Sequence, residues 1–206
     1  MSDPAERVYL VDDDLGVRES VSGLLLSHGI CVTCFASAAQ YLEYRRTDAA
    51  SCLVLDLQMP GINGLELQRQ LIDDDLLPII FISGQGDVPS TAQAMKAGAV
   101  EFLTKPVDPE ELVPAVTAAL ARDRAYRAKR AEMDKLRGRL GQLSPRERDV
   151  LPLIVKGLLN KQSAAELGIA EVTLQIHRSK IMKKMDAGSF AELVRMANKL
   201  GIPAAR

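Results

Sequence analysis

The feature that most constrains the fold is an apolar run that stops abruptly at one carboxylate. The segment Cys52–Gly61 reads CLVLDLQMPG, so its apolar residues end at Asp56 and a Met-Pro-Gly turn follows. A continuous apolar run closed by a breaker is typical of a strand buried on both faces of a parallel sheet. Because open α/β sheets place their chemistry at the carboxyl ends of strands, we expect Asp56 at such an edge. Taken alone, this aspartate could equally be a simple turn residue.

Strand-like and helix-like segments alternate five times within residues 1–120. Helical spacing is seen, for example, over Val17–His28, and Asp108-Pro109 is typical of a helix start. The alternation predicts an α/β fold with a doubly wound five-stranded parallel sheet. The predicted strands are Val8–Val11, Ile30–Phe35, the run that ends at Asp56, Pro78–Ser83 and Ala99–Leu103.

Polar residues stand at the carboxyl ends of these strands. Asp12 and Asp13 follow the first strand, Asp56 ends the third, and Ser83 and Lys105 stand at the fourth and fifth. Three carboxylates at close quarters repel one another unless a cation lies among them, and carboxylate oxygens suit Mg²⁺. An aspartate nucleophile beside Mg²⁺ and a lysine can receive a phosphoryl group. The alternative, unrelated turn aspartates and a surface lysine, requires five independent coincidences.

The charge is divided unevenly along the chain. Residues 1–120 carry a net charge of −11, whereas residues 121–141 and 142–206 each carry +5, although the whole chain has only −1. An acidic half joined to a basic half predicts two domains with different partners, nucleic acid being a candidate for the basic one. The acidic start and the lack of a membrane-spanning apolar run lead us to expect a cytoplasmic protein without membrane contact.

A long helix is expected between the two halves. From Leu112 to about Arg139 the only helix breaker before Gly138 is Pro114, which stands early enough to kink the helix without ending it. Apolar residues then recur every three to four positions, a spacing that fits either a coiled coil or packing on a neighbouring domain. These residues are Met133, Leu136, Leu140 and Leu143.

The second half has the pattern of a small all-α domain with a helix-turn-helix. Helices are predicted over Pro145–Lys156, Asn160–Leu167, Val172–Met185 and Ser189–Leu200, and Gly168 permits a tight turn between the second and third. The third helix has an apolar stripe and a face rich in basic and hydrogen-bonding side chains. From charge alone, that face could equally be a solvated surface.

At this level of detail both halves resemble known families. The motifs VDDD, LDLQMPG, FIS and Lys105-Pro106 resemble, in order and spacing, the receiver domain of two-component response regulators. The segment LSPRERDVLPLIVKGLLNKQSAAELGIAEVTLQIHRSKIMKKM resembles the LuxR-type DNA-binding domain, and the combination is similar to the FixJ/NarL family. The resemblance implies a flavodoxin-like receiver at 1–120, a helical linker at 121–141 and a helix-turn-helix domain at 142–206.

The receiver resemblance implies specific roles at the sheet edge. Asp56 would be phosphorylated by a sensor histidine kinase. Mg²⁺ would be bound by Asp13, Asp56 and the backbone carbonyl of Gln58, with Asp12 acting through water. A phosphatase that uses an aspartyl-phosphate usually has a second aspartate at the position of Gln58, so this residue argues against an enzyme.

The same resemblance implies a switch. Lys105 and Ser83 would contact the phosphoryl oxygens, Phe102 matches the aromatic switch position, and the Lys105–Pro106 peptide bond would be cis, which X-Pro bonds allow at low cost. The segment Gly86–Phe102 would form a homodimer surface upon phosphorylation. Its apolar residues could equally belong to the core: Val88, Met95 and Val100.

The LuxR-type resemblance implies a set of contacts to double-stranded promoter DNA, and it also allows RNA polymerase as a partner. The candidate base readers are Gln175, Ile176 and Ser179. The candidate phosphate contacts are Lys161, Thr173, Arg178, Lys180 and Lys183. Gln can pair with adenine, while Lys and Arg bind phosphates and supply affinity rather than sequence readout.

The expected function is transcription regulation switched by phosphorylation of Asp56. The alternative is a phosphorylation-independent DNA-binding transcription factor in which the receiver is only a scaffold. Three residues depart from the family pattern and put local geometry in question: Ala170 at a helix cap, Ser163 at a buried position and Pro152 inside a helix.

Overall fold

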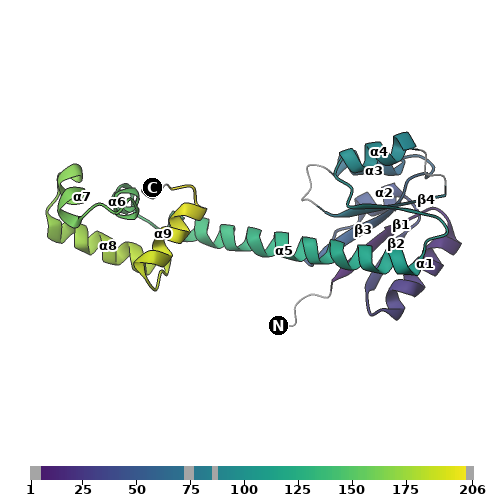
Figure 1. Cartoon of the computed structure of the whole chain (residues 1–206), viewed down its shortest axis with the longest axis horizontal. Coiled ribbons are helices and arrows are strands. Elements are labelled where there is room, and N and C mark those ends of the chain that lie inside the picture. The colour runs from purple at the N-terminus through teal and green to yellow at the C-terminus, as the bar shows by residue number, and fades with distance from the viewer. Residues whose placement is uncertain (1–5, 72–76, 85–87, 203–206) are drawn as a thin grey trace. The chain divides into compact units, whose positions relative to one another are not determined.

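The computed structural model describes residues 6–71, 77–84 and 88–202, so the predicted dimer segment's residues 86 and 87 lie outside the described part. The chain divides into two compact units, residues 1–127 and 128–206. The long helix α5 (Pro109–Gly141) begins in the first unit and ends in the second, which confirms the predicted joining helix (Figure 1).

The first unit is built on the predicted five-stranded parallel sheet, with strand order β2-β1-β3-β4-β5. The strands are β1 (Arg7–Val11), β2 (Cys31–Phe35), β3 (Ser51–Asp56), β4 (Ile79–Ser83) and β5 (Glu101–Thr104). Every residue of β3 and β4 is buried, as expected for central strands covered on both faces.

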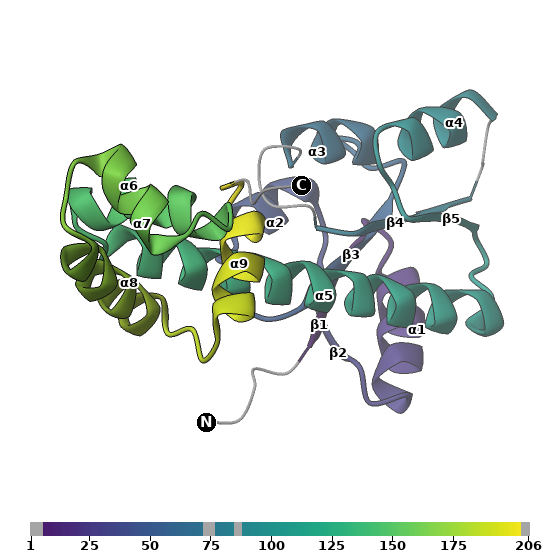
Figure 2. The same cartoon turned by 60° about the vertical axis from the view of Figure 1, so that its left-hand side comes forward.

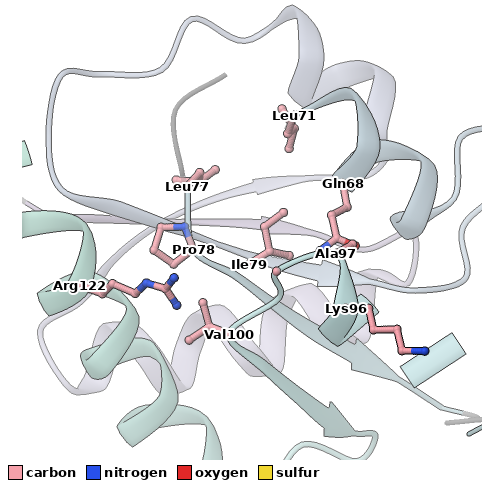
Figure 3. Close-up of a pocket in the computed structure, with 10 residues that line it drawn as sticks. Gln68, Leu71, Leu77, Pro78, Ile79, Lys96, Ala97, Val100 and Arg122 are labelled. Carbon is pink, nitrogen blue, oxygen red and sulfur yellow. The ribbon is translucent and has the colours of Figure 1, made fainter. Parts of the chain in front are cut away.

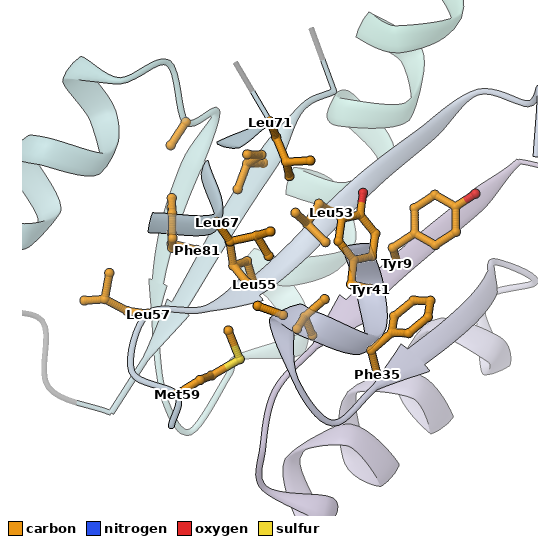
Figure 4. Packing of buried hydrophobic residues seen from close by; sticks show 14 of the residues in the cluster. Tyr9, Phe35, Tyr41, Leu53, Leu55, Leu57, Met59, Leu67, Leu71 and Phe81 are labelled. Carbon is orange, nitrogen blue, oxygen red and sulfur yellow. The ribbon is translucent and has the colours of Figure 1, made fainter. Parts of the chain in front are cut away.

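Helices cover both faces of this sheet. The helices α1 (Leu15–Ser27) and α5 pack on one face, and α2 (Ala38–Glu43), α3 (Gly64–Gln70) and α4 (Val88–Lys96) pack on the other (Figure 2). Alternate residues of each strand enter the two cores, so Leu53 faces α2 and α3 (Figure 4) whereas Val54 faces α1 and α5. The doubly wound fold is therefore confirmed.

Two helices begin earlier than their apolar spacing predicts. The helix α1 starts at Leu15 because the carboxylate of Asp14 caps it, accepting hydrogen bonds from the amides of Gly16 and Val17. The helix α4 starts at Val88, four residues before Ala92, where the helix-like spacing of the sequence begins. In both cases the first turn lies on the surface, where apolar periodicity carries no signal.

A buried carboxylate attaches α5 to the start of β3. The carboxylate of Asp123, which is buried, accepts hydrogen bonds from the amide of Ser51 at 2.8 Å and from Nε of Arg127 at 2.8 Å. Arg127 also pairs with Asp48 at 2.6 Å. The strand that ends at Asp56 is thus fixed to the long helix at its other end.

The second unit is the predicted helical domain, formed by the end of α5 and four further helices. These are α6 (Pro145–Val155), α7 (Asn160–Leu167), α8 (Glu171–Met185) and α9 (Phe190–Lys199). Gly168 ends α7 in the left-handed conformation at φ 64°, which allows the turn into α8. Leu174, Ile181 and Met185 of α8 are fully buried in the shared core.

The apolar seam at the end of α5 packs within this second unit. Leu143 is part of its core, Leu140 packs against that core, and Leu136 is buried. Of the two possibilities that the spacing left open, the structure therefore supports packing on the neighbouring domain.

The three departures from the family pattern have local consequences. Ala170 occupies the cap of α8 without a side-chain hydrogen bond, and the hydroxyl of Ser163 is buried without a partner in the described part of the chain. Pro152 is accommodated within α6, which continues to Val155. None of them disrupts the helix-turn-helix.

Candidate functional site

The three predicted aspartates meet at the carboxyl edge of the sheet. One carboxylate oxygen from each of Asp12, Asp13 and Asp56 lies within 4.8 Å of the other two. The β1 and β3 strands are neighbours in register, which brings their ends together. Asp12 and Asp56 are buried and Asp13 is exposed, so the cluster opens to solvent on one side.

Lys105 joins this cluster from the residue after β5. Its ammonium lies 2.6 Å from Oδ2 of Asp12 and 3.2 Å from Oδ1 of Asp56. The amide of Lys105 donates to the carbonyl of Ser83, and the Lys105–Pro106 bond is cis, as predicted. One lysine therefore stands against three carboxylates.

The electrostatics of the cluster reflect this imbalance. Burial raises the pKa of Asp56, Lys105 opposes that effect, and the neighbouring Asp12 adds to it, so the pKa of Asp56 lies above its ordinary value. Burial alone would lower the pKa of Lys105, but hydrogen bonding to Asp12 and the charge of Asp56 raise it above its usual value. The site is thus short of positive charge.

The donor set fits a divalent cation. Carboxylate oxygens are the ligands that Mg²⁺ prefers, and the solvent-facing side leaves room for its water ligands. The amide of Gln58 donates to the Asp56 carboxylate, so the turn after β3 lies directly against the cluster. A cation here would also relieve the repulsion among the carboxylates.

Ser83 and Phe102 lie close to this edge on neighbouring strands. Ser83 ends β4, is fully buried and pairs in register with Thr104. The ring of Phe102 stacks on that of Phe81, with centroids 6.4 Å apart.

The sequence analysis missed one residue that contributes to the site, Gly64. A Cβ atom at this position would lie 2.4 Å from the carbonyl oxygen of Asp56. Only a glycine allows the backbone at position 64 to lie so close to Asp56, but a single sequence has no pattern that reveals this role.

In the second unit, α8 presents most of the predicted DNA-contacting residues to solvent. Ile176 is 50% exposed, so part of its apolar surface is open to a partner. Thr173 and Arg178 are partly buried. The remaining candidates are exposed: Lys161, Gln175, Ser179, Lys180 and Lys183.

Two basic residues of α8 have partners inside the domain. Nη1 of Arg178 donates to Oδ1 of Asn160 at 2.8 Å, and its guanidinium lies 5.1 Å from the ring centroid of Phe190. Lys184 donates to the buried carboxylate of Glu147 at 2.7 Å. The ammonium of Lys184 therefore makes a contact within the domain.

The part of the chain that the structure describes contains no helix that is both long and apolar enough to span a membrane.

Comparison with known proteins identifies both units. The family model of the response regulator receiver domain matches residues 8–117. The family model of bacterial regulatory proteins of the luxR family matches residues 141–197. The first match contains the carboxylate cluster, and the second contains α8 with its exposed basic residues.

Full-length relatives have the same combination. Nodulation protein W of Bradyrhizobium diazoefficiens is 48% identical over 198 residues, which cover 96% of this chain and 87% of that protein. The response regulator protein TodT of Pseudomonas putida is 45% identical over 97% of this chain and 88% of its own length. The transcriptional regulatory protein FixJ of Azorhizobium caulinodans is 42% identical over 95% of this chain and 93% of its own length, so the family is one of transcription regulators rather than of enzymes.

A solved structure is similar to this chain over both units. The response regulator StyR superposes with a TM-score of 0.88 and 46% identity, over 95% of this chain and 99% of that structure. The similarity to StyR that the linker and the motifs predict is thereby confirmed. The chain belongs to the two-component response regulators that control transcription, with a receiver domain joined to a luxR-family DNA-binding domain.

Proposed function

We propose that Asp56 accepts the phosphoryl group from a sensor histidine kinase. The observation that carries this proposal is the meeting of Asp12, Asp13 and Asp56 with Lys105 at one sheet edge. A carboxylate oxygen of Asp56 attacks the phosphorus atom, and the bond between phosphorus and the donor breaks. Lys105 and the hydroxyl of Ser83 then contact the phosphoryl oxygens.

The chain's own residues prepare this transfer. Asp13, Asp56 and the backbone carbonyl of Gln58 would hold Mg²⁺, with Asp12 acting through water. When bound, Mg²⁺ neutralises charge on the phosphoryl oxygens. The buried β3 strand holds the Asp56 carboxylate in place, and the amide of Gln58 orients it.

Phosphorylation would change the surface formed by α4 and β5. It adds about −1.5 to −2 charge at the sheet edge, which favours new contacts with Ser83 and Lys105 and movement of Phe102. Val88 is 81% exposed and Met95 is 42% exposed, which supports a partner surface rather than a core role for these two residues. We infer that this surface forms a homodimer of phosphorylated receivers.

Dimerisation would place two luxR-type domains on paired DNA half-sites. Gln175, Ile176 and Ser179 are the proposed base readers, and their exposure on α8 supports this role. The phosphate contacts would be Lys161, Thr173, Arg178, Lys180 and Lys183. Domain borders are proposed at 1–120, 121–141 and 142–206, and RNA polymerase is a proposed third partner.

The proposal is tested on the full-length protein with Mg²⁺ and acetyl phosphate. Intact-mass measurement should show one added phosphoryl group, which Asp56→Asn should abolish. The matched control is Asp14→Asn, because Asp14 caps α1 outside the cluster and should leave phosphorylation intact. Phosphorylation that persists in Asp56→Asn would refute the assignment of the acceptor.

Sedimentation and DNA binding then test the switch. With beryllium fluoride as phosphoryl mimic, the protein should dimerise and bind a duplex selected from a random pool more tightly. Asp56→Asn should do neither. If Asp56→Asn binds the duplex as tightly as the activated protein, the receiver is only a scaffold and the phosphorylation-independent alternative holds.

The DNA contacts are tested separately. Lys180→Ala should weaken binding to all sequences and flatten its salt dependence, whereas Gln175→Ala should reduce the preference for the selected sequence, by about 1–3 kcal/mol. Lys156→Ala, an exposed lysine at the end of α6, is the matched control. Unchanged sequence preference in Gln175→Ala would exclude Gln175 as a base reader.

A further inference from the structure

One residue of the carboxylate cluster, Asp12, is held at four points. Its amide donates to the carbonyl of Phe35 in β2 at 3.2 Å, and its Oδ2 lies 2.6 Å from the ammonium of Lys105. Its Oδ1 accepts from the amide of Asp14 at 2.9 Å, and its backbone carbonyl accepts from Nη1 of Arg18 at 2.7 Å. Both the backbone and the carboxylate of this buried residue are therefore fixed.

Two of these contacts also fix the backbone on either side of Asp13. The peptide group that precedes Asp13 is held through its carbonyl by Arg18. The peptide group that follows Asp13 is held through its amide by Oδ1 of Asp12. Because each peptide group is planar, fixing both of them sets the direction in which the Asp13 side chain leaves the backbone. The side chain itself is exposed, so burial does not hold its carboxylate in place.

Arg18 reaches back to this carbonyl from the start of α1. It is the fourth residue of the helix, and its amide donates to the carbonyl of the capping residue Asp14 at 3.1 Å. Its side chain is half-buried. The hydrogen bond to the Asp12 carbonyl thus ties the first turn of α1 to the end of β1, on either side of Asp13.

We propose that Arg18 is a positioning residue, whose hydrogen bond to the Asp12 carbonyl holds the Asp13 carboxylate where Mg²⁺ binds. This inference rests on the proposed Mg²⁺ site and adds to it a residue that is not itself a ligand. Outer partners of metal ligands commonly change metal affinity by about 10–100-fold when they are substituted. Because Arg18 acts on the backbone beside a ligand, we expect the lower end of that range.

The sign of the effect separates positioning from charge. Arg18 is a cation near the cluster, so the loss of its charge alone would strengthen the binding of a divalent cation. The loss of positioning would weaken it instead, because the Asp13 carboxylate would then have to be ordered when the metal binds.

The test measures metal binding by the full-length protein without a phosphodonor. The chain has no tryptophan to report binding by fluorescence, so the probe is Mn²⁺, which prefers the same oxygen ligands as Mg²⁺. The paramagnetic resonance signal of free Mn²⁺ gives the bound fraction, and competition with Mg²⁺ gives the Mg²⁺ affinity. Arg18→Met keeps the aliphatic stem but removes the guanidinium, and it should weaken Mg²⁺ binding by about tenfold.

Two further variants complete the comparison. Arg18→Lys keeps a charged donor, and since the contact uses a single N–H group, its Mg²⁺ affinity should stay within about threefold of wild type. Arg122→Met is the matched control and should leave the affinity unchanged. Arg122 is an exposed arginine of α5 that lies beside Pro78 and Val100, near the end of the sheet where β4 begins and away from the cluster (Figure 3).

Two other readouts would not change if Arg18 only supported the fold. In Arg18→Met without metal, nuclear magnetic relaxation should show less ordered amides at Asp13 and Asp14, while the amides of β3 keep their wild-type order. In phosphorylation by acetyl phosphate, the Mg²⁺ concentration for half the maximal rate should rise by the same factor as the dissociation constant. The rate at saturating Mg²⁺ should remain at the wild-type value.

Mg²⁺ binding by Arg18→Met that is unchanged or tighter would overturn the positioning role, as would an equal loss in Arg122→Met. If the wild type binds Mn²⁺ no more tightly than Asp13→Asn does, the proposed metal site is itself wrong and this inference falls with it. Should Arg18→Met unfold, as judged by its thermal transition, Arg18→Gln takes its place in every comparison, because its neutral amide is too short to replace the guanidinium.

Discussion

Each unit of the molecule contains a buried carboxylate paired with a lysine, yet the two pairs have opposite electrostatics. Asp56 lies 3.2 Å from Lys105 and has a raised pKa. Glu147 lies 2.7 Å from Lys184, and hydrogen bonds from Lys184 and from the backbone at Ser144 lower its pKa. Both carboxylates are at least nine-tenths buried.

The difference lies in what surrounds each pair. Lys105 is shared between Asp56 and Asp12, and Asp13 adds a third carboxylate, so negative charge is in excess. Glu147 has its own lysine and also accepts from the amide of Ser144, which closes a capping box. The same residue types therefore form a site that favours an added cation in one unit and a self-sufficient structural contact in the other.

The largest expected effect is on phosphoryl transfer. Asp13→Asn should slow phosphorylation by acetyl phosphate about 100-fold or more at fixed Mg²⁺, because a bound cation contributes several kcal/mol of charge stabilisation. Quantifying phosphorylated protein over time measures the rate. Asp14→Asn should keep the wild-type rate of phosphorylation. An equal loss of rate in both variants would show that the transfer does not depend on the carboxylate cluster in particular.

The second-largest effect concerns the pair of Glu147 and Lys184 in the second unit. Glu147→Gln should lower the free energy of unfolding of the second unit by about 1–3 kcal/mol, because it replaces the charged hydrogen bond from Lys184 with a weaker bond to a neutral oxygen. Hydrogen exchange of the amides in α6 and α8 measures this in the full-length protein. A neutral result would mean that solvent already screens the pair.

The pair of Glu147 and Lys184 should also make the stability of the second unit depend on pH in a defined direction. Because the folded-state pKa of Glu147 is lowered from 4.5, its contribution is present above that value and is lost as the pH falls through the lowered folded-state pKa. In Glu147→Gln the second unit should lose less stability over this acidic range than wild type. Identical acid profiles would contradict the assignment.

Asp56→Asn should have the opposite sign of effect. Without Mg²⁺ it should raise the stability of the receiver by about 0.5–2 kcal/mol, because it removes a buried charge from an excess of negative charge. Exchange of the β3 and β4 amides is the measurement. Saturating Mg²⁺ should shrink the gain, and destabilisation by Asp56→Asn in both conditions would make the two pairs alike.

The smallest effect concerns the cap of α8. Ala170→Ser should stabilise the second unit by about 1 kcal/mol by supplying the missing side-chain hydrogen bond. Thermal unfolding of the unit, followed by circular dichroism, checks the shift. If the gain is absent, the amides at the start of α8 already have partners in water.

The sequence predicted the receiver site well because its geometry follows from one rule. The carboxyl ends of parallel strands meet at one edge, so Asp12, Asp13, Asp56 and Lys105 could be brought together without knowledge of side-chain packing. What was missed there is backbone proximity: nothing local distinguishes Gly64 as the residue that lies against the Asp56 carbonyl.

The DNA-binding helix could be predicted less completely. Helical spacing alone does not distinguish Lys184 from the other basic residues of α8, yet Lys184 pairs with Glu147, which stands 37 residues earlier in the chain. Arg178 is similarly held by Asn160 and Phe190, from two other helices. Contacts between helices decide how each basic side chain is oriented, and these contacts have no periodic signature.

The contact between α5 and the start of β3 has a consequence for protein engineering. The receiver family match ends at residue 117, but Asp123 and Arg127 lie beyond it and hold the amide of Ser51 and the carboxylate of Asp48. A chimera spliced at residue 117 would strand that buried amide without its acceptor. A fusion of this receiver to a different output module should therefore retain its own helix through Arg127.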